Sequence, residues 1–397
     1  SGAPIEFGAL LVSPDGRIQS VGPDRDVPRP ADVPFTTFDD AALLPGLINT
    51  HTHLELTGFE GLFPQNDFPA WIRRLRELKT SRTPEQYLIA ARRGLADCYA
   101  SGVTTVADTG DSGAVIRVLA EAEASGIAYQ EVFGPDPAQL DESLENLKCR
   151  IRDLSELTRG RVRLGVSPHA AYSVSGPLFR AVADWSRAEK LPLAVHVAES
   201  RAESEFLFSG SGPFAEAWRV RGIPLPGSSG RSPINWLAEH GVLSPLSLCI
   251  HAVQARSEDI RQLAEAGSAV AHCPLSNQAH GHGVAPALEM LHSGIRVGLG
   301  TDSVASVGRL DLLAEARLAG RHTALNAGQL LELCTLGGAR ALNLADEIGS
   351  LEPGKWADCT IIRLPGGAGT PSERVLASTP GDVLRTYVGG REVYRAA

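Results

Sequence analysis

The stretch Leu44-Pro-Gly-Leu-Ile-Asn-Thr-His51-Thr-His53 constrains the fold more than any other part of the chain. Leu47 and Ile48 are typical of the end of a buried strand, and two histidines follow at its C-terminal end. Because side chains alternate across a strand, a His-x-His pair places both imidazoles on one face. Their nitrogens then point at one position, as Zn²⁺ or Fe²⁺ binding requires. Two half-exposed polar residues at a strand end are the alternative explanation of this pair taken alone.

Strand-like and helix-like segments alternate after this stretch, which is typical of a parallel α/β barrel. Helical periodicity lies between the strands, for example over residues 85–97 and 178–187. We therefore predict a (β/α)8 TIM barrel over residues 45–349. The strands expected after the first cover residues 102–108, 127–133, 162–169, 192–196, 246–251, 268–272 and 295–302.

Both ends of the chain carry short strand patterns around turns. We predict that residues 1–44 and 350–397 together form one small β-sandwich module. Its strands are expected at residues 8–12, 17–21, 359–363 and 384–394.

Composition narrows the class of partner. The net charge is −9 and no dense basic run occurs, which argues against nucleic acid and anionic membranes as partners. No apolar run approaches the length that spans a bilayer. The 6 cysteines show no close pairing, which favours reduced thiols in a cytoplasmic enzyme.

Residues able to bind a metal end most of the expected barrel strands. In a closed barrel these C-terminal ends meet at one mouth, so residues far apart in sequence become neighbours. The residues concerned are His51, His53, His169, His196, His251, His272 and Asp302.

These residues and their flanking motifs resemble the amidohydrolase superfamily, specifically its cytosine deaminase, triazine hydrolase and nucleoside deaminase branch. The joint match is very specific and runs in order across nearly the whole chain. The matching motifs are Pro45-Gly-Leu-Ile-Asn-Thr-His51-Thr-His53, His196-Val-Ala-Glu199, Ile250-His251, His272-Cys-Pro-Leu-Ser-Asn277, Gly298-Leu-Gly-Thr-Asp302-Ser303 and Gly349-Ser-Leu-Glu-Pro-Gly354-Lys355-Trp-Ala-Asp358.

The resemblance implies a distorted barrel, a composite β-module and one divalent metal ion. It implies that the metal ligands are His51, His53, His196 and Asp302. It also implies that Glu199 shuttles a proton while His251 and Asp302 orient a water molecule activated by the metal. Such a donor set leaves a position for water, whose pKa the ion lowers to about 7. We expect Zn²⁺, although Fe²⁺ or Mn²⁺ also suits these donors.

Further residues refine this expectation. Residues 161–170 contain no lysine that could bridge two metals after carboxylation, as in related hydantoinases, so a single metal is favoured. His169, in Pro168-His-Ala-Ala-Tyr-Ser173, matches a substrate-contacting histidine of the resembling nucleoside deaminases; a structural histidine is the alternative. His272 is expected to be structural, and a loop at the pocket rim is expected to hold His280 and His282, although the sequence does not settle these roles.

The pocket walls are expected to come from the two long connections, residues 58–82 and 200–243. Phe68 and Trp71 could lay an aromatic ring over a heterocycle, with core packing an equal alternative.

We predict a metal-dependent hydrolytic deaminase of an aminopurine nucleoside. The segments at 51–56 and 203–213 look most like aminofutalosine deaminases. Adenosine or S-adenosylhomocysteine, guanine and chlorinated triazines stay open as small-molecule heterocyclic substrates. The alternatives are a chlorohydrolase or another C–N hydrolase on the same barrel, and an inert binding protein. The sequence does not fix the oligomeric state, and the resemblance leaves a homodimer open.

Overall fold

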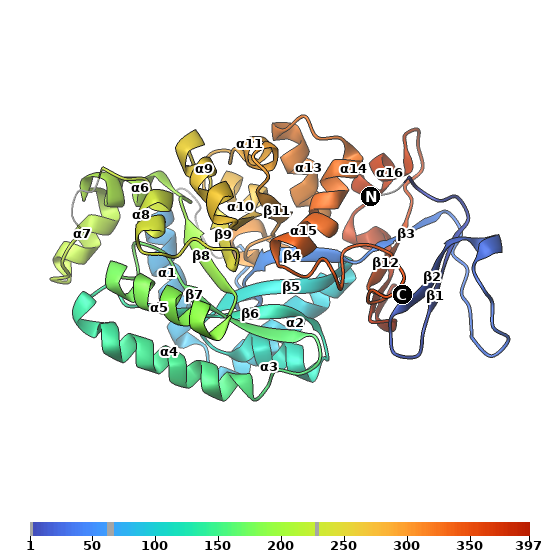
Figure 1. Cartoon of the computed structure of the whole chain (residues 1–397), viewed down its shortest axis with the longest axis horizontal. Coiled ribbons are helices and arrows are strands. Elements are labelled where there is room, and N and C mark those ends of the chain that lie inside the picture. Colours follow the sequence, from blue (N-terminus) through green and yellow to red (C-terminus); the bar gives the residue numbers. More distant parts are fainter. Residues whose placement is uncertain (1–2, 62–66, 227–229) are drawn as a thin grey trace.

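Eight parallel strands form a nearly closed barrel in the computed structural model, which describes residues 3–61, 67–226 and 230–397 (Figure 1). The strands are adjacent in chain order, so the predicted α/β barrel is confirmed. They are β4 (Leu47–Thr52), β5 (Val103–Gly110), β6 (Ser125–Val132), β7 (Val162–Pro168), β8 (Leu193–Val197), β9 (Ser247–His251), β10 (Ala269–His272) and β11 (Arg296–Leu299). Short parts of the two expected pocket connections, residues 62–66 and 227–229, lie outside the described residues.

Helices follow the strands and cover the outside of the barrel (Figure 1). None of those described combines the length and apolar character needed to cross a bilayer. The α-helices are α1 (Phe68–Ser81), α2 (Pro84–Ala100), α3 (Ala114–Glu121), α4 (Leu140–Ser155), α5 (Gly176–Glu189), α6 (Arg201–Ser209), α7 (Gly212–Val220), α8 (Pro233–Glu239), α9 (Ser257–Ala266), α10 (Pro274–Ala279), α11 (Ala287–His292), α12 (Val304–Val307), α13 (Leu312–His322), α14 (Ala327–Leu333), α15 (Leu336–Ala341) and α16 (Pro371–Leu376). Short 3₁₀ helices are η1 (Asp24–Asp26), η2 (Leu54–Leu56), η3 (Pro137–Gln139) and η4 (Pro380–Asp382).

The inside of the barrel is a packed core that fills the space beneath the mouth. Strand β6 shows the pattern: Ile127 and Tyr129 belong to the inner cluster, whereas Ala128 packs with the outer helices. This alternation follows from the two-residue period of a strand. Because the interior is filled, only the side chains at the C-terminal ends of the strands remain to build a site.

The terminal strands form a separate antiparallel region beside the barrel (Figure 1). A four-stranded sheet has the order β14 (Arg391–Arg395), β13 (Val383–Val388), β12 (Cys359–Arg363) and β3 (Ala41–Pro45). The hairpin of β1 (Gly8–Val12) and β2 (Ile18–Pro23) attaches to the C-terminal segment, where Ile18 N donates to Lys355 O at 2.8 Å. The prediction that both ends of the chain form one β-module is confirmed. Strand β3 was not predicted. The exact domain boundaries stay a prediction.

One buried ion pair joins the barrel to the terminal sheet. Arg161, just before β7, donates from Nη1 to Asp358 Oδ1 at 2.8 Å, and the Asp358 side chain is 3% exposed. The same oxygen accepts the backbone N–H of Gly389 in the turn between β13 and β14, at 2.8 Å. Asp358 therefore connects three segments that are distant in sequence.

We expect Asp358→Ala to destabilise the fold by about 3–5 kcal/mol, because it leaves the Arg161 guanidinium partly buried without its partner. Chemical denaturation measures the change. Glu216→Ala is the matched control, since Glu216 pairs with Arg219 at the surface, where side chains are 67% and 50% exposed; that pair should contribute less than about 1 kcal/mol. Equal losses in both variants would contradict a special role for Asp358.

Candidate metal centre and catalytic site

The site lies where the first and last barrel strands meet. Asp302 N donates to His51 O at 3.0 Å, and an isolated parallel bridge links Thr52 with Asp302. A Cβ at Gly300 would lie 2.8 Å from the His51 Cβ, closer than real side chains approach, so only glycine allows the two segments to come together here. This contact brings a histidine from β4 beside an aspartate that follows β11.

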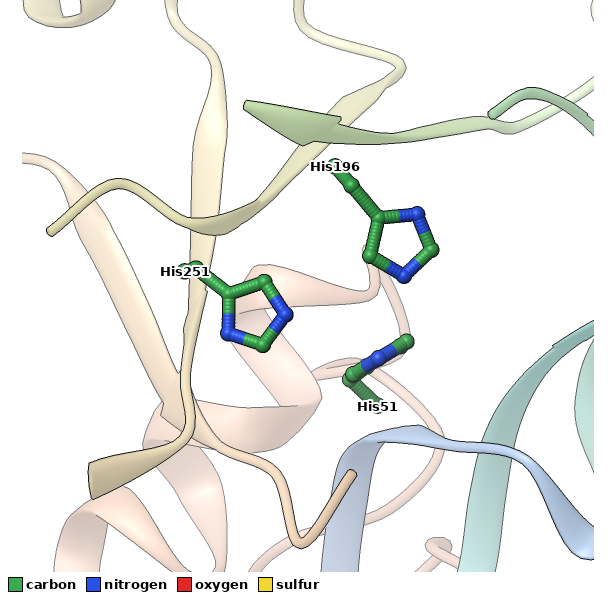
Figure 2. A group of neighbouring side chains, drawn as sticks. All are labelled: His51, His196 and His251. Atoms are coloured by element: carbon green, nitrogen blue, oxygen red, sulfur yellow. The ribbon is translucent and has the colours of Figure 1, made fainter. Parts of the chain in front are cut away.

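The predicted metal ligands converge at this point. His51 Nε2 and His53 Nε2 lie 3.5 and 3.4 Å from Asp302 Oδ1. His51 also shares a second group with His196 and His251, whose possible ligand atoms all lie within 4.8 Å of one another. In Figure 2 these three imidazoles point toward one another from β4, β8 and β9.

Hydrogen bonds orient the imidazoles toward the centre. His53 Nδ1 lies 2.7 Å from Thr109 O, and His196 Nδ1 lies 3.2 Å from His169 O. A carbonyl oxygen only accepts, so each Nδ1 carries the proton and each Nε2 presents a lone pair. Both ring nitrogens of His51 are buried and have no hydrogen-bond partner within the described ranges. These donors and the Asp302 carboxylate fit a divalent metal ion such as Zn²⁺.

Burial keeps these imidazoles neutral. Removal from water lowers the pKa of His53 to about 4, with the neighbouring His51 adding to the effect. Burial holds the pKa of His196 well below its usual range as well. Neutral imidazoles are the form that binds metal ions, so the lone pairs are available at neutral pH.

An unusual backbone conformation brings His251 into the site. Ile250 belongs to the inner core, so regular alternation would send the next side chain outward. The φ of 73° at His251 interrupts the extended strand, and its ring lies 5.6 Å from the His51 ring. His251 Nδ1 is 3.0 Å from the Asn277 side-chain oxygen, which turns Nε2 toward the cluster.

Glu199 is a buried carboxylate beside the cluster. Its Oε1 lies 3.5 Å from both His251 Nε2 and His282 Nε2. Burial alone would raise the pKa of Glu199, but the facing His251 and His282 lower it to about 2. Glu203 holds the backbone that carries Glu199, because its carboxylate accepts the backbone N–H groups of Ala198 and Glu199 at 3.1 and 2.9 Å.

Residues from the end of β10 to His282 divide between the site and its surroundings. Ser276 donates to Asp302 Oδ2 at 2.5 Å. His282 reaches Glu199, and His280 Nε2 lies 3.1 Å from the Ser306 hydroxyl. His272 lies off the cluster, beside a cavity of about 240 Å³ that Asn277 also lines.

The expected substrate-contacting residues lie around the same mouth. The Phe68 ring contacts His282 edge-on with a centroid distance of 4.6 Å, and Trp71 contacts His280 at 4.8 Å. The His169 ring lies 4.9 Å from the His196 ring. Phe68 and Trp71 are both buried, as the alternative of core packing requires, and their contact with a substrate stays a prediction.

Sequence reasoning missed a group of buried charged residues near the mouth. Lys79, on α1, lies 2.9 Å from Glu55 Oε1 and 2.6 Å from Asp111 Oδ1. Burial raises the pKa of Glu131 to about 8, with Lys79 opposing the rise. Glu131 had a usable signal, since it is an acidic residue at the end of a strand, in step with the inward Ile127 and Tyr129.

Comparisons with known proteins agree with this geometry. Residues 42–393 match the Amidohydrolase family. The 5-methylthioadenosine/S-adenosylhomocysteine deaminase of Symbiobacterium thermophilum is 30% identical over 407 residues, which cover 98% of this chain and 89% of that protein. An adenosine deaminase structure from Xanthomonas campestris with bound zinc has a TM-score of 0.82 at 25% identity, covering 98% and 88% of the two chains. An atrazine chlorohydrolase of Arthrobacter aurescens, complexed with zinc, has a TM-score of 0.81 at 25% identity, covering 97% and 90%.

We expect Lys79→Met to destabilise the protein by about 3–5 kcal/mol, because it leaves the Glu55 carboxylate buried without its cation. Chemical denaturation at neutral pH measures this loss. Arg74→Met is the matched control on the same helix, where the Arg74–Glu77 pair is 54% and 65% exposed; its loss should stay below about 1 kcal/mol. A Lys79 variant as stable as the control would show that the pair contributes little.

Proposed function

Because the chain belongs to the amidohydrolase family, we propose that it is a metal-dependent hydrolytic deaminase that acts on an aminopurine nucleoside. The convergence of the imidazoles of His51, His53 and His196 with the Asp302 carboxylate is the observation that carries the proposal. The sequence relative named above acts on 5-methylthioadenosine and S-adenosylhomocysteine, which are both adenosines substituted at the 5′ position. Aminofutalosine is another 6-aminopurine nucleoside and stays a prediction.

The proposed cofactor is one Zn²⁺ ion held by His51, His53, His196 and Asp302. The unpartnered nitrogens of His51 and the outward hydrogen bonds of His53 and His196 support this set. When bound, a divalent ion acts as a Lewis acid that lowers the pKa of a water molecule to about 7. Two zinc-bound neighbours of the same fold favour zinc over Fe²⁺ or Mn²⁺.

The remaining chemistry belongs to the side chains. Glu199 is proposed to accept a proton from the attacking water and to deliver it to a ring nitrogen of the substrate. His251 and Asp302 are proposed to hold the water oxygen in line with the reacting carbon. When that carbon has gained the oxygen, its C–N bond breaks: the proton delivered by Glu199 stays on the ring nitrogen, and the amino group leaves as ammonia with the second proton of the water. The short distances from Glu199 Oε1 to two imidazoles support a proton path at this atom.

The substrate is proposed to lie between the aromatic pair on α1 and His169. Phe68 and Trp71 stack on each other with ring centroids 6.0 Å apart, close to the loop that carries His280 and His282. A flat heterocycle matches such an apolar wall. The cytoplasmic location and a small-molecule substrate, predicted from the sequence, belong to the same proposal.

No observation favours the alternatives. The chlorohydrolase shares the fold and zinc, but the sequence relative named above is a deaminase. An inert binding protein would have no chemical reason to keep several titratable groups buried around one point.

We expect the purified protein to hold close to one zinc ion per chain. His196→Asn should hold almost none, because the loss of one imidazole ligand lowers the affinity of the site for zinc. Mass-spectrometric metal analysis after dialysis measures this. His292→Asn, at the exposed end of α11, is the control and should retain the metal. A metal-free wild-type protein that stays metal-free after reconstitution would contradict the proposed centre.

We expect Glu199→Gln to lower ammonia release by about 10²–10⁴-fold while retaining the metal, because the amide cannot transfer the proton. The assay uses adenosine, 5′-methylthioadenosine, S-adenosylhomocysteine and aminofutalosine, with ammonia as the readout. Glu205→Gln, on the exposed side of α6, is the matched control. Near-normal turnover by Glu199→Gln would remove Glu199 from the mechanism, and chloride or amine release without deamination would overturn the proposed reaction.

A further inference from the structure

Glu131 is a buried carboxyl group that the proposed mechanism does not use. It is the penultimate residue of β6, in step with Ile127 and Tyr129, which face the inside of the barrel, so its side chain points to the mouth. The residue is 6% exposed, and its Oε1 is buried without a hydrogen-bond partner among the described residues. A buried polar atom left without a partner is costly, which indicates that a ligand supplies the missing contact.

The groups around Glu131 offer acceptors rather than donors. A carboxylate oxygen of Glu131 and ring nitrogens of His169 and His196 lie within 4.8 Å of one another. The Ser173 hydroxyl donates to Ala170 O at 3.0 Å, so it must accept from His169 Nδ1 at 2.7 Å. His169 Nε2 therefore presents a lone pair. In either protonation state Glu131 also keeps an oxygen that accepts, so a donor group of a ligand finds acceptors on both Glu131 and His169.

A second metal ion does not satisfy this group. His196 Nδ1 is engaged with His169 O, which leaves His196 only Nε2 for coordination. If the proposed zinc ion uses that lone pair, a second ion would have only Glu131 and His169, whereas protein metal sites normally use three or four ligands. Lys79 does not fill the position either, because its closest carboxylates are those of Glu55 and Asp111.

We propose that Glu131 accepts hydrogen bonds from the sugar hydroxyl groups of the substrate and thereby selects ribonucleosides over their deoxy analogues. This inference rests on the proposed deaminase function. In a 6-aminopurine nucleoside the ring nitrogens are acceptors, and the amino group is at the reacting carbon near Glu199. The sugar hydroxyl groups are the other donors of such a substrate, and the proposal assigns them to Glu131, whose oxygen lies within 4.8 Å of ring nitrogens of His169 and His196. Glu131 is thus assigned as a specificity-determining residue.

Ammonia release from adenosine, 2′-deoxyadenosine, 3′-deoxyadenosine and 2′,3′-dideoxyadenosine tests the proposal. We expect the wild-type kcat/KM to fall about 100-fold or more from adenosine to the dideoxy analogue, because an acceptor built for a hydroxyl is left unpaired. Glu131→Ala should reduce this ratio to within about threefold, mainly by raising KM for adenosine. Glu131→Gln keeps one acceptor and should give an intermediate ratio. Gln130→Ala is the matched control, because neighbouring side chains on β6 face opposite ways.

The outcomes separate the two proposals. A wild-type protein that deaminates adenosine and dideoxyadenosine equally well would overturn the role of Glu131 and leave the deaminase function intact; this measurement does not depend on the variants folding. A wild-type protein that deaminates no nucleoside would overturn both. Metal analysis gives a further check, since two ions per wild-type chain and one in Glu131→Gln would show that Glu131 binds a second metal instead.

Discussion

The closure of the barrel between β4 and β11 is the constraint on which the site depends. Asn49 Nδ2 donates to the Thr301 hydroxyl at 2.8 Å, and Thr301 N donates back to Asn49 Oδ1 at 3.1 Å. This two-way contact fixes the backbone just before Asp302 against the strand that carries His51. The approach requires Gly298, since a Cβ there would lie 2.4 Å from Thr50 Cγ2. Donors some 250 residues apart in sequence share one point because two glycines allow the first and last strands to touch.

Three buried glutamates around this point have different acidities because their neighbours differ. Two imidazoles face Glu199, and they outweigh burial and lower its pKa to about 2. Burial raises the pKa of Glu203 to about 8, although its carboxyl group accepts two backbone N–H groups. Burial also raises the pKa of Glu131, because the nearby cation Lys79 pairs with Glu55 instead. Catalytic sites typically give residues of the same type different pKa values, so that each can have a different role.

The sequence was sufficient to predict the barrel and the residues at its mouth, but not the contacts between loops. The proximity of His51, His196 and Asp302 could be predicted, because the C-terminal ends of the strands in a barrel lie at one rim. His251 was also expected at the mouth, but the left-handed φ that turns its ring into the cluster is not indicated by any residue pattern. Lys79 could not be placed because it lies on a helix inside a long connection, and its partner depends on how that connection folds back. Strand β3 was missed for a similar reason, since its pairing with β12 joins segments from opposite ends of the chain.

Helix α1 connects the stability of the fold to the shape of the mouth. Its C-terminal half carries Lys79, whose partner Glu55 lies two residues after His53. Its N-terminal end carries Phe68, which packs on His282, a neighbour of Glu199. A buried ion pair contributes little net stability compared with an apolar replacement, but breaking one partner is costly, so such a pair fixes one arrangement against others. The Lys79–Glu55 pair thus restricts how α1 can lie across the barrel. Because one rigid helix carries both contacts, the position of the aromatic wall is tied to the strand that supplies His51 and His53.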